Sequence, residues 1–197
     1  MVDGSIWGGF WGLMGLYALA HVVYVRRVNP GILGHRMFLK RGTESWDLVW
    51  FSIFVPIFVG ILVVAGVDLR SGSHLLPSWV RLVGLVMFVL GGGLFLRAMA
   101  ENPFFEKTVR IQSERDHHVI DTGPYRVVRH PGYVGMVPWI LSIPLLLISA
   151  RAFLPAGLAV TCLVVRTALE DWTLHKKLPG YAEYATRVRS RLIPGVW

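Results

Sequence analysis

Long apolar stretches dominate this chain, rather than the one-sided apolar stripes of soluble helices. Five can be read, at residues 5–25, 48–67, 79–100, 133–150 and 152–169. A helix needs about 20 residues to cross the ~30 Å hydrocarbon core of a bilayer. The pattern therefore predicts an all-α integral membrane protein with about five transmembrane helices, of which the last two are short for a full crossing.

The last two stretches are separated by Arg151 alone, which predicts a helical hairpin with this residue at its tip. The open ends of a hairpin meet, so His130 and Glu170 should be neighbours at one depth. Arg166 and Glu170 are four residues apart and share a helix face, so they could instead simply pair with each other.

Composition agrees with a membrane protein of one domain. Hydrophobic residues make up 54% of the chain and charged residues 16%, whereas soluble domains carry about 25% charged residues. No internal repeat or linker divides residues 1–197, so we expect a single membrane domain. Its polar parts are the connection 101–132 and the C-terminal tail, which together should form a cap on the bundle.

The basic residues predict the orientation. Three alternate connections hold five each of the 20 lysines and arginines, namely Arg26, Arg27, Arg36, Lys40, Arg41; Lys107, Arg110, Arg115, Arg126, Arg129; and Lys176, Lys177, Arg187, Arg189, Arg191. By the positive-inside rule, the N-terminus faces out, and the cap and C-terminus face the cytoplasm of a cell membrane. Membrane topology thus accounts for the net charge of +8. The excess of basic residues therefore does not indicate nucleic acid as a partner.

Polar chemistry is concentrated in residues 123–135, GPYRVVRHPGYVG, directly before an apolar stretch. Two arginines, a histidine and two tyrosines are costly to keep at the mouth of a membrane helix, so this segment predicts a site. The hairpin brings Arg166, Glu170 and Asp171 to the same end. The histidines lack metal-ligand spacing and no cysteine supports them, so no metal site is predicted.

Several motifs in combination resemble a known family. GPYRVVRHPGYVG, RTALEDWTL, LPGYAEY and RLIPGVW are similar to the integral-membrane methyltransferases, meaning the isoprenylcysteine carboxyl methyltransferases, their bacterial relatives and the phospholipid N-methyltransferases. The upstream ENPFFEKTVRIQSERDHHVIDTGPY resembles the bacterial branch. The likeness covers about residues 101–197, and this chain has Glu170-Asp171 where the family usually has two glutamates.

The resemblance implies S-adenosylmethionine as methyl donor, held in a cytoplasmic pocket by residues 101–197. The implied cofactor-binding residues are Arg110, Gln112, His118, Gly123, Tyr125, His130, Tyr133, Gly135 and Glu170. The implied catalytic residues are Arg129, His130, Arg166 and Glu170. The expected acceptor is a lipophilic molecule at the membrane boundary, above all an isoprenylcysteine-like carboxylate. Such an acceptor needs no base, whereas an amine would have to be deprotonated by His130 or Glu170.

Three alternatives stay open on the sequence. A phospholipid amine could be the acceptor. A sterol-type membrane reductase using NADPH also carries an Arg-His-Pro motif, although five spans are few for that class. A non-catalytic membrane scaffold or small transporter would explain the spans, but it leaves the polar cluster without a purpose.

Overall fold

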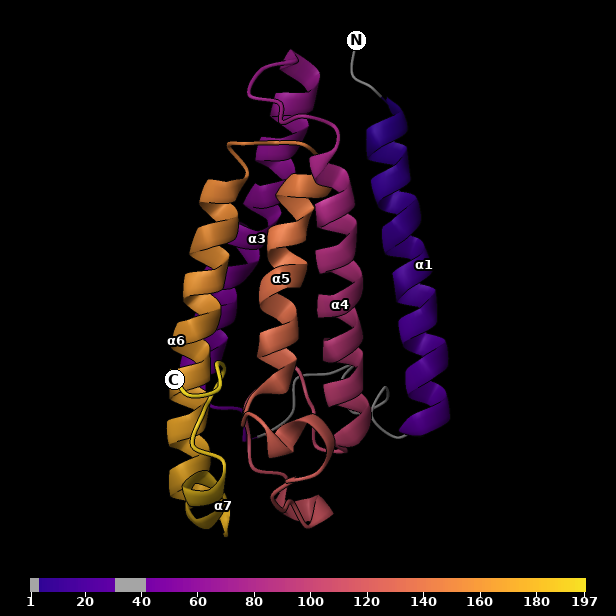
Figure 1. The fold of residues 1–197 in the computed structure, drawn as a ribbon. Coiled ribbons are helices and arrows are strands. Elements are labelled where there is room, and N and C mark those ends of the chain that lie inside the picture. The colour runs from indigo at the N-terminus through magenta and orange to yellow at the C-terminus, as the bar shows by residue number, and fades with distance from the viewer. Residues whose placement is uncertain (1–3, 31–41) are drawn as a thin grey trace.

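A computed structural model describes residues 4–30 and 42–197, in which the regular elements are helices (Figure 1). The long ones are α1 (Gly4–Val28), α3 (Ser45–Ser71), α4 (Val80–Glu101), α5 (Pro131–Leu146) and α6 (Phe153–Lys177). The shorter ones are η1 (Ser113–Arg115), η2 (Gly123–Arg126) and α7 (Tyr181–Arg187). The all-α fold is confirmed.

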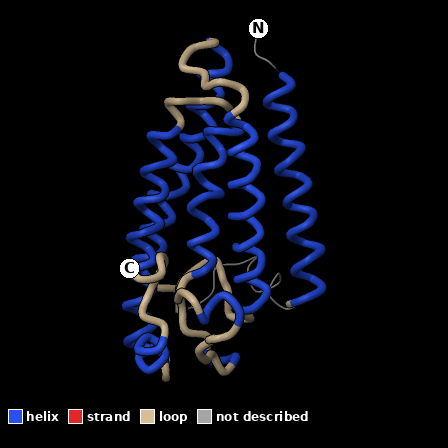
Figure 2. The backbone as a smooth tube through the Cα atoms, viewed as in Figure 1, coloured by secondary structure: helices blue, strands red, loops and turns tan. Residues whose placement is uncertain are grey.

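Four helices, α1, α3, α4 and α6, are long and apolar enough to cross a membrane, and α5 is a shorter apolar helix. The chain is a multi-pass membrane protein. The described basic connections lie at one end of the bundle, together with α7 and the loop between α4 and α5, as Figure 2 shows. Arg36, Lys40 and Arg41 lie outside the described residues, and the orientation in the membrane stays a prediction.

Helix α5 lies in the middle of the bundle and packs most closely on α4. Gly91 and Gly135 meet at this crossing. A Cβ on Gly91 would come 2.6 Å from the Gly135 carbonyl oxygen, and one on Gly135 would come 2.5 Å from the Gly91 carbonyl oxygen. Small residues let membrane helices approach this closely. The glycines therefore place α5 deep enough to carry its first turn under the cap.

The predicted stretch 133–150 ends early as a helix. Helix α5 stops at Leu146, and Ile148 takes a positive φ of 47°. The following residues pair with the α3–α4 connection, because Leu76 N–H donates to Ile148 O at 2.7 Å and Ala150 N–H donates to His74 O at 3.0 Å. These contacts turn the chain toward α6.

Helix α6 continues beyond the apolar stretch 152–169 that was predicted to cross the membrane. Its 25 residues measure about 38 Å at 1.5 Å per residue, which exceeds the hydrocarbon core. It ends at Leu178-Pro179-Gly180, where Gly180 has a φ of 79°. The last two turns therefore extend beyond the bundle and carry Glu170 and Asp171 into the cap.

Both ends of α3 are tied to the hairpin by buried aspartates. Asp47 pairs with Arg166, with Nε 3.0 Å from Oδ1. At the other end Asp68 accepts hydrogen bonds from Ser149 Oγ at 2.5 Å and from Arg151 Nε at 2.6 Å. Buried charges in membrane helices are costly unless paired, so these pairs set how α3 docks against α5 and α6.

Candidate active site

The loop before α5 and the C-terminal tail join to form the cap. The Arg129 and His130 N–H groups donate to the carbonyls of Ser190 and Arg191, both at 3.0 Å. The Tyr184 hydroxyl donates to Tyr125 O at 2.7 Å. The predicted meeting of the two polar segments is confirmed.

A cavity of about 230 Å³ lies between this cap and the ends of the helices. Glu170 and His130 both line it, as the hairpin predicts. Its walls come from α3, α4, the 102–130 loop, α5, α6 and α7. The site residues predicted from the sequence that line it are Arg110, His118, Tyr125, Arg129, His130, Tyr133, Arg166 and Glu170.

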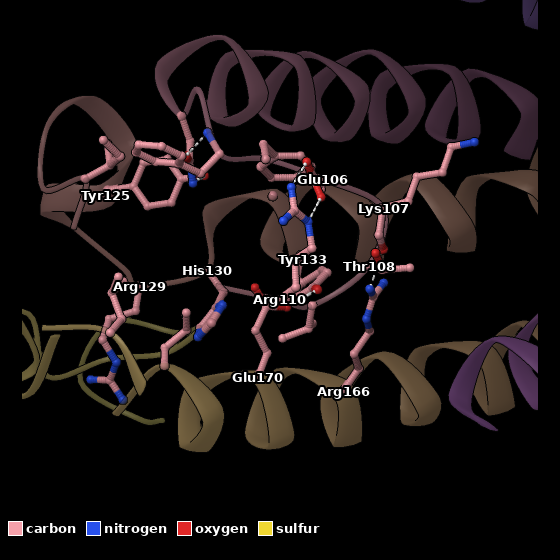
Figure 3. Close-up of a pocket in the computed structure, with 18 of the residues that line it drawn as sticks. Glu106, Lys107, Thr108, Arg110, Tyr125, Arg129, His130, Tyr133, Arg166 and Glu170 are labelled. Carbon is pink, nitrogen blue, oxygen red and sulfur yellow. Dashed lines mark hydrogen bonds and ion pairs between the residues drawn. The ribbon is translucent and has the colours of Figure 1, made fainter. Parts of the chain in front are cut away.

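Glu170 and Tyr133 form the polar floor of the cavity. The Tyr133 hydroxyl donates to Glu170 Oε2 in a very short hydrogen bond. Figure 3 shows Glu170 and Arg166 rising from the same helix, Glu170 toward Tyr133 and Arg166 toward Lys107 and Thr108. Among the described residues, Glu170 has no other hydrogen bond or ion pair. Its carboxylate is therefore the acidic group best placed to receive a ligand.

Arg166 stabilises the wall of the cavity. Its Nη2 donates to Lys107 O at 2.5 Å and to Asp47 Oδ2 at 3.2 Å. The guanidinium also lies over the rings of Trp50 and Phe51, 4.4 and 4.9 Å from their centroids. The pairing with Glu170 that the helix spacing allowed is replaced, in the described part of the chain, by the ion pair with Asp47. Arg166 thus holds the 107–109 segment of the loop against α6.

Arg129 points toward the tail. Its guanidinium makes two hydrogen bonds to Asp171, at 2.8 and 3.1 Å, and its Nη1 donates to the carbonyls of Val188 and Arg189. In Figure 3 the group extends away from Glu170. Burial alone would lower the pKa of Arg129, but the hydrogen bonds to Asp171 outweigh burial and raise this pKa above its ordinary value. These contacts give Arg129 the role of joining the cap.

Arg110 is held by two glutamates. It contacts Glu106 through Nε at 2.7 Å and Nη2 at 2.9 Å, and Glu114 at 2.7 Å. The hydrogen bonds with Glu106 raise the pKa of Arg110 further above its usual range. The side chain therefore remains a fixed cation at the cavity wall.

His118 lies at the rim. Its Nδ1 lies 2.9 Å from Asp116 O, which makes this nitrogen the N–H donor and leaves Nε2 as an acceptor in the neutral ring. The neighbouring His117 packs on Phe104 with 4.4 Å between ring centroids. Burial, followed by the nearby charges, lowers the pKa of His117 to about 4.

Three predicted cofactor-binding residues do not line the cavity. Gln112 is buried, and its amide donates to Phe104 O at 2.7 Å, which shapes the loop. Gly123 has a φ of 53°, and a Cβ there would meet the Glu101 carboxylate at 2.6 Å, so it forms the turn into η2. Gly135 lies at the crossing with α4. All three residues lie behind the cavity wall and support the segments that form it.

The sequence reasoning missed several cavity residues. Asp47 supports the wall through Arg166, and its second oxygen accepts the Val109 N–H at 2.7 Å. Trp50, Phe51 and Phe104 line the cavity itself. The available signal for Asp47 was its position directly before the apolar stretch 48–67. An aspartate there also fits an ordinary helix end, so it did not indicate a site.

Comparison with known proteins agrees with this arrangement. The model of the "Isoprenylcysteine carboxyl methyltransferase (ICMT) family" matches residues 83–176. A "Probable protein-S-isoprenylcysteine O-methyltransferase" of Oryza sativa subsp. indica is 31% identical over 122 residues, covering 58% of this chain and 61% of that protein. "Protein-S-isoprenylcysteine O-methyltransferase B" of Arabidopsis thaliana is 33% identical over 118 residues, covering 57% and 58%. The match thus spans about three fifths of these relatives.

A solved structure has the same fold. It is described as the eukaryotic intramembrane Ras methyltransferase ICMT, and it matches with a TM-score of 0.69 at 22% identity. The match covers 97% of this chain and 67% of that one. The structural likeness thus includes most of α1 and α3, both of which lie outside the matched family region.

Proposed function

Because the chain belongs to the isoprenylcysteine carboxyl methyltransferase family through residues 83–176, we propose that it transfers a methyl group from S-adenosylmethionine to a lipophilic acceptor at the membrane boundary. The acceptor that the relatives' names favour is the carboxylate of an isoprenylcysteine-like molecule. The observation that carries the proposal is that the cavity at the end of the membrane bundle has one polar and one aromatic side.

The polar side fits the donor molecule. S-adenosylmethionine supplies an electrophilic methyl group on a sulfonium, and it also carries an ammonium, a carboxylate and ribose hydroxyls. Glu170 is a carboxylate that, within residues 4–30 and 42–197, accepts one hydrogen bond, from Tyr133, so it can accept another from an ammonium or hydroxyl group. Arg110 and the Nε2 atom of His118 add a cation and an acceptor to the lining of the cavity.

The aromatic side fits an apolar acceptor. Trp50, Phe51, Phe54, Phe95 and Met136 line the cavity where it adjoins the helices. A lipid-borne chain can lie against these side chains while its carboxylate end reaches the methyl group of a donor held on the polar side. An acceptor arriving from the bilayer and a donor arriving from water would then meet in one place.

The chain's own contribution is to position the reactants and exclude water. A carboxylate acceptor is already ionised and nucleophilic, so no residue has to remove a proton from it. Aligning two reactants can supply several kcal/mol of a reaction barrier, on the order of 7–11 in favourable cases. The ion pairs of Arg110, Arg129 and Arg166 fix the cavity walls for that purpose.

The test uses full-length protein in lipid nanodiscs. Labelled-methyl transfer from S-adenosylmethionine is measured to a prenylcysteine analogue, to phosphatidylethanolamine and to no acceptor, and NADPH binding is measured in parallel. We expect transfer to the prenylcysteine analogue. Transfer to the phospholipid alone would replace the acceptor class, and binding of NADPH without S-adenosylmethionine would overturn the proposal.

Glu170→Gln provides the matched site variant. We expect it to lower the affinity for S-adenosylmethionine about 10-fold or more, since a charge-assisted hydrogen bond is worth about 1.5–3 kcal/mol. Glu183→Gln is the control, because Glu183 is exposed and pairs with Arg187 on α7. Unchanged affinity in Glu170→Gln would remove this carboxylate from the donor site.

A further inference from the structure

The two adjacent acids at the end of α6 have different surroundings. Asp171 is buried, and both of its oxygens are occupied. Oδ1 receives Arg129 Nε at 2.8 Å, the Tyr181 hydroxyl at 2.9 Å and His130 Nε2 at 3.3 Å. Oδ2 receives Arg191 Nε at 2.8 Å and Arg129 Nη2 at 3.1 Å.

These contacts saturate the Asp171 carboxylate. A carboxylate offers about four lone-pair positions, and five contacts from four side chains already occupy them. Asp171 therefore has no capacity left for a ligand, in contrast to Glu170. These four hydrogen-bond partners come from three separate segments, the loop before α5, α7 and the tail, so the carboxylate is where the cap is assembled.

The contact with Asp171 also fixes how His130 presents its ring. Nε2 lies 3.3 Å from Asp171 Oδ1 and 3.4 Å from the Tyr181 hydroxyl, whose own hydrogen is donated to Asp171. Both neighbours therefore accept from Nε2, and in the neutral imidazole Nδ1 keeps its lone pair. Nδ1 has no hydrogen-bond partner among the described residues, and His130 lines the cavity. The ring thus offers an acceptor suited to an amino or hydroxyl group of a ligand, and unsuited to a carboxylate.

The tail depends on the same carboxylate. Arg191 donates to Asp171, and its guanidinium lies 5.0 Å from the Trp197 ring centroid. The Arg191 carbonyl in turn accepts the His130 N–H. Tail and histidine are therefore joined twice, once through the backbone and once through Asp171.

We propose that Asp171 is a positioning residue that sets the Nε2–H tautomer of His130 and makes donor binding depend on the docked C-terminal tail. The inference rests on the proposed function for the identity of the donor. Arg191 is then required for donor affinity although it lies on the tail and is not among the residues that line the cavity.

Arg191→Met tests the dependence on the tail, with Arg187→Met as the matched control. Arg187 lies four residues earlier and pairs with Asp121 and Glu183, not with Asp171. In nanodiscs we expect Arg191→Met to raise the Kd for S-adenosylmethionine about 10- to 100-fold, the loss typical when a buried charged acceptor loses a partner. Arg187→Met should stay within about 2-fold. Equal affinities for the two variants would overturn the proposal.

Hydrogen exchange of the ligand-free protein provides a readout that does not depend on the donor. Asp171→Asn and Arg191→Met should both speed exchange at the Arg129 and His130 amides, which bond the tail. If wild-type protein fails to bind S-adenosylmethionine but these amides respond as expected, the proposed function fails and the coupling stands. If it binds and the amides do not respond, the coupling fails alone.

His130→Asn and His130→Gln test the tautomer. An asparagine amide occupies the place of Nδ1 and can keep the acceptor, while it loses Asp171. A glutamine amide occupies the place of Nε2 and can keep Asp171, while it loses the acceptor. We expect His130→Asn to retain more affinity for S-adenosylmethionine than His130→Gln. We expect His130→Gln to retain more protection from hydrogen exchange at the backbone amides of residues 129 and 130. The reverse order, or no difference, would contradict the assigned tautomer.

Discussion

The ion pair between Asp47 and Arg166 gives the sharpest test of how the cavity is built. Both side chains are buried, with exposed fractions of 0% and 6%. Each also holds the loop, Arg166 through Lys107 O and Asp47 through the Val109 N–H. We consider Asp47→Asn, Arg166→Met and the two changes together.

The magnitude follows from leaving a charge buried alone. Removing one partner of a buried ion pair costs about 3–5 kcal/mol, whereas replacing both can be nearly neutral. Asparagine still offers an oxygen to Val109, so we expect Asp47→Asn near the lower limit, at about 3 kcal/mol. Arg166→Met should cost a similar amount. The double variant should lose about 2 kcal/mol less unfolding free energy than the two single variants lose together, a coupling within the range for residues in contact.

Unfolding of the four proteins by SDS in mixed micelles measures this double-mutant cycle, and S-adenosylmethionine binding is measured beside it. Because the 107–109 segment lines the cavity, donor affinity should fall in both single variants. Additive free energies, with a coupling below about 0.5 kcal/mol, would refute the argument that the two charges stabilise each other.

Three further outcomes follow from the packing and charges. Gly135→Ala should destabilise the protein by about 1–3 kcal/mol because its Cβ meets the backbone of α4, while Gly93→Ala, where no atom lies within 4 Å, should be neutral in thermal unfolding. Acidification from pH 6.5 toward 4 should lower stability, because the unfolded chain then binds a proton that folded His117 does not; His117→Gln should flatten that part of a pH titration of unfolding. Arg151→Met should leave Asp68 without its cation and lower the unfolding temperature, with donor affinity unchanged because this pair lies at the far end of the bundle; a loss of affinity at preserved stability would contradict that placement.

Local pattern was sufficient for the outline of the fold. Long apolar stretches predicted the helices, and the break at Arg151 predicted the hairpin that brings His130 and Glu170 to one cavity. Helix α6 ends at Lys177, just before Pro179 and Gly180, two residue types that resist helix continuation. These features depend on residues close together in the chain, so the sequence contains the information directly.

The partners of the charged residues could not be predicted in the same way. The spacing of Arg166 and Glu170 allowed an ion pair, yet Arg166 contacts Asp47, 119 residues away. The extra apolar residues after Leu146 likewise looked helical, but they pair with the α3–α4 connection. In both cases a tertiary contact competes with a local one and replaces it.

The sequence by itself determined that this is a helical membrane protein whose polar chemistry gathers at one end, because hydrophobic length and charge distribution are properties of each segment alone. Only the tertiary structure decided that Glu170 faces the cavity while Asp171 assembles the cap, and that Gly135 serves packing. Adjacent carboxylates on one helix point in different directions, and which of them meets a cavity depends on what the rest of the bundle places around them.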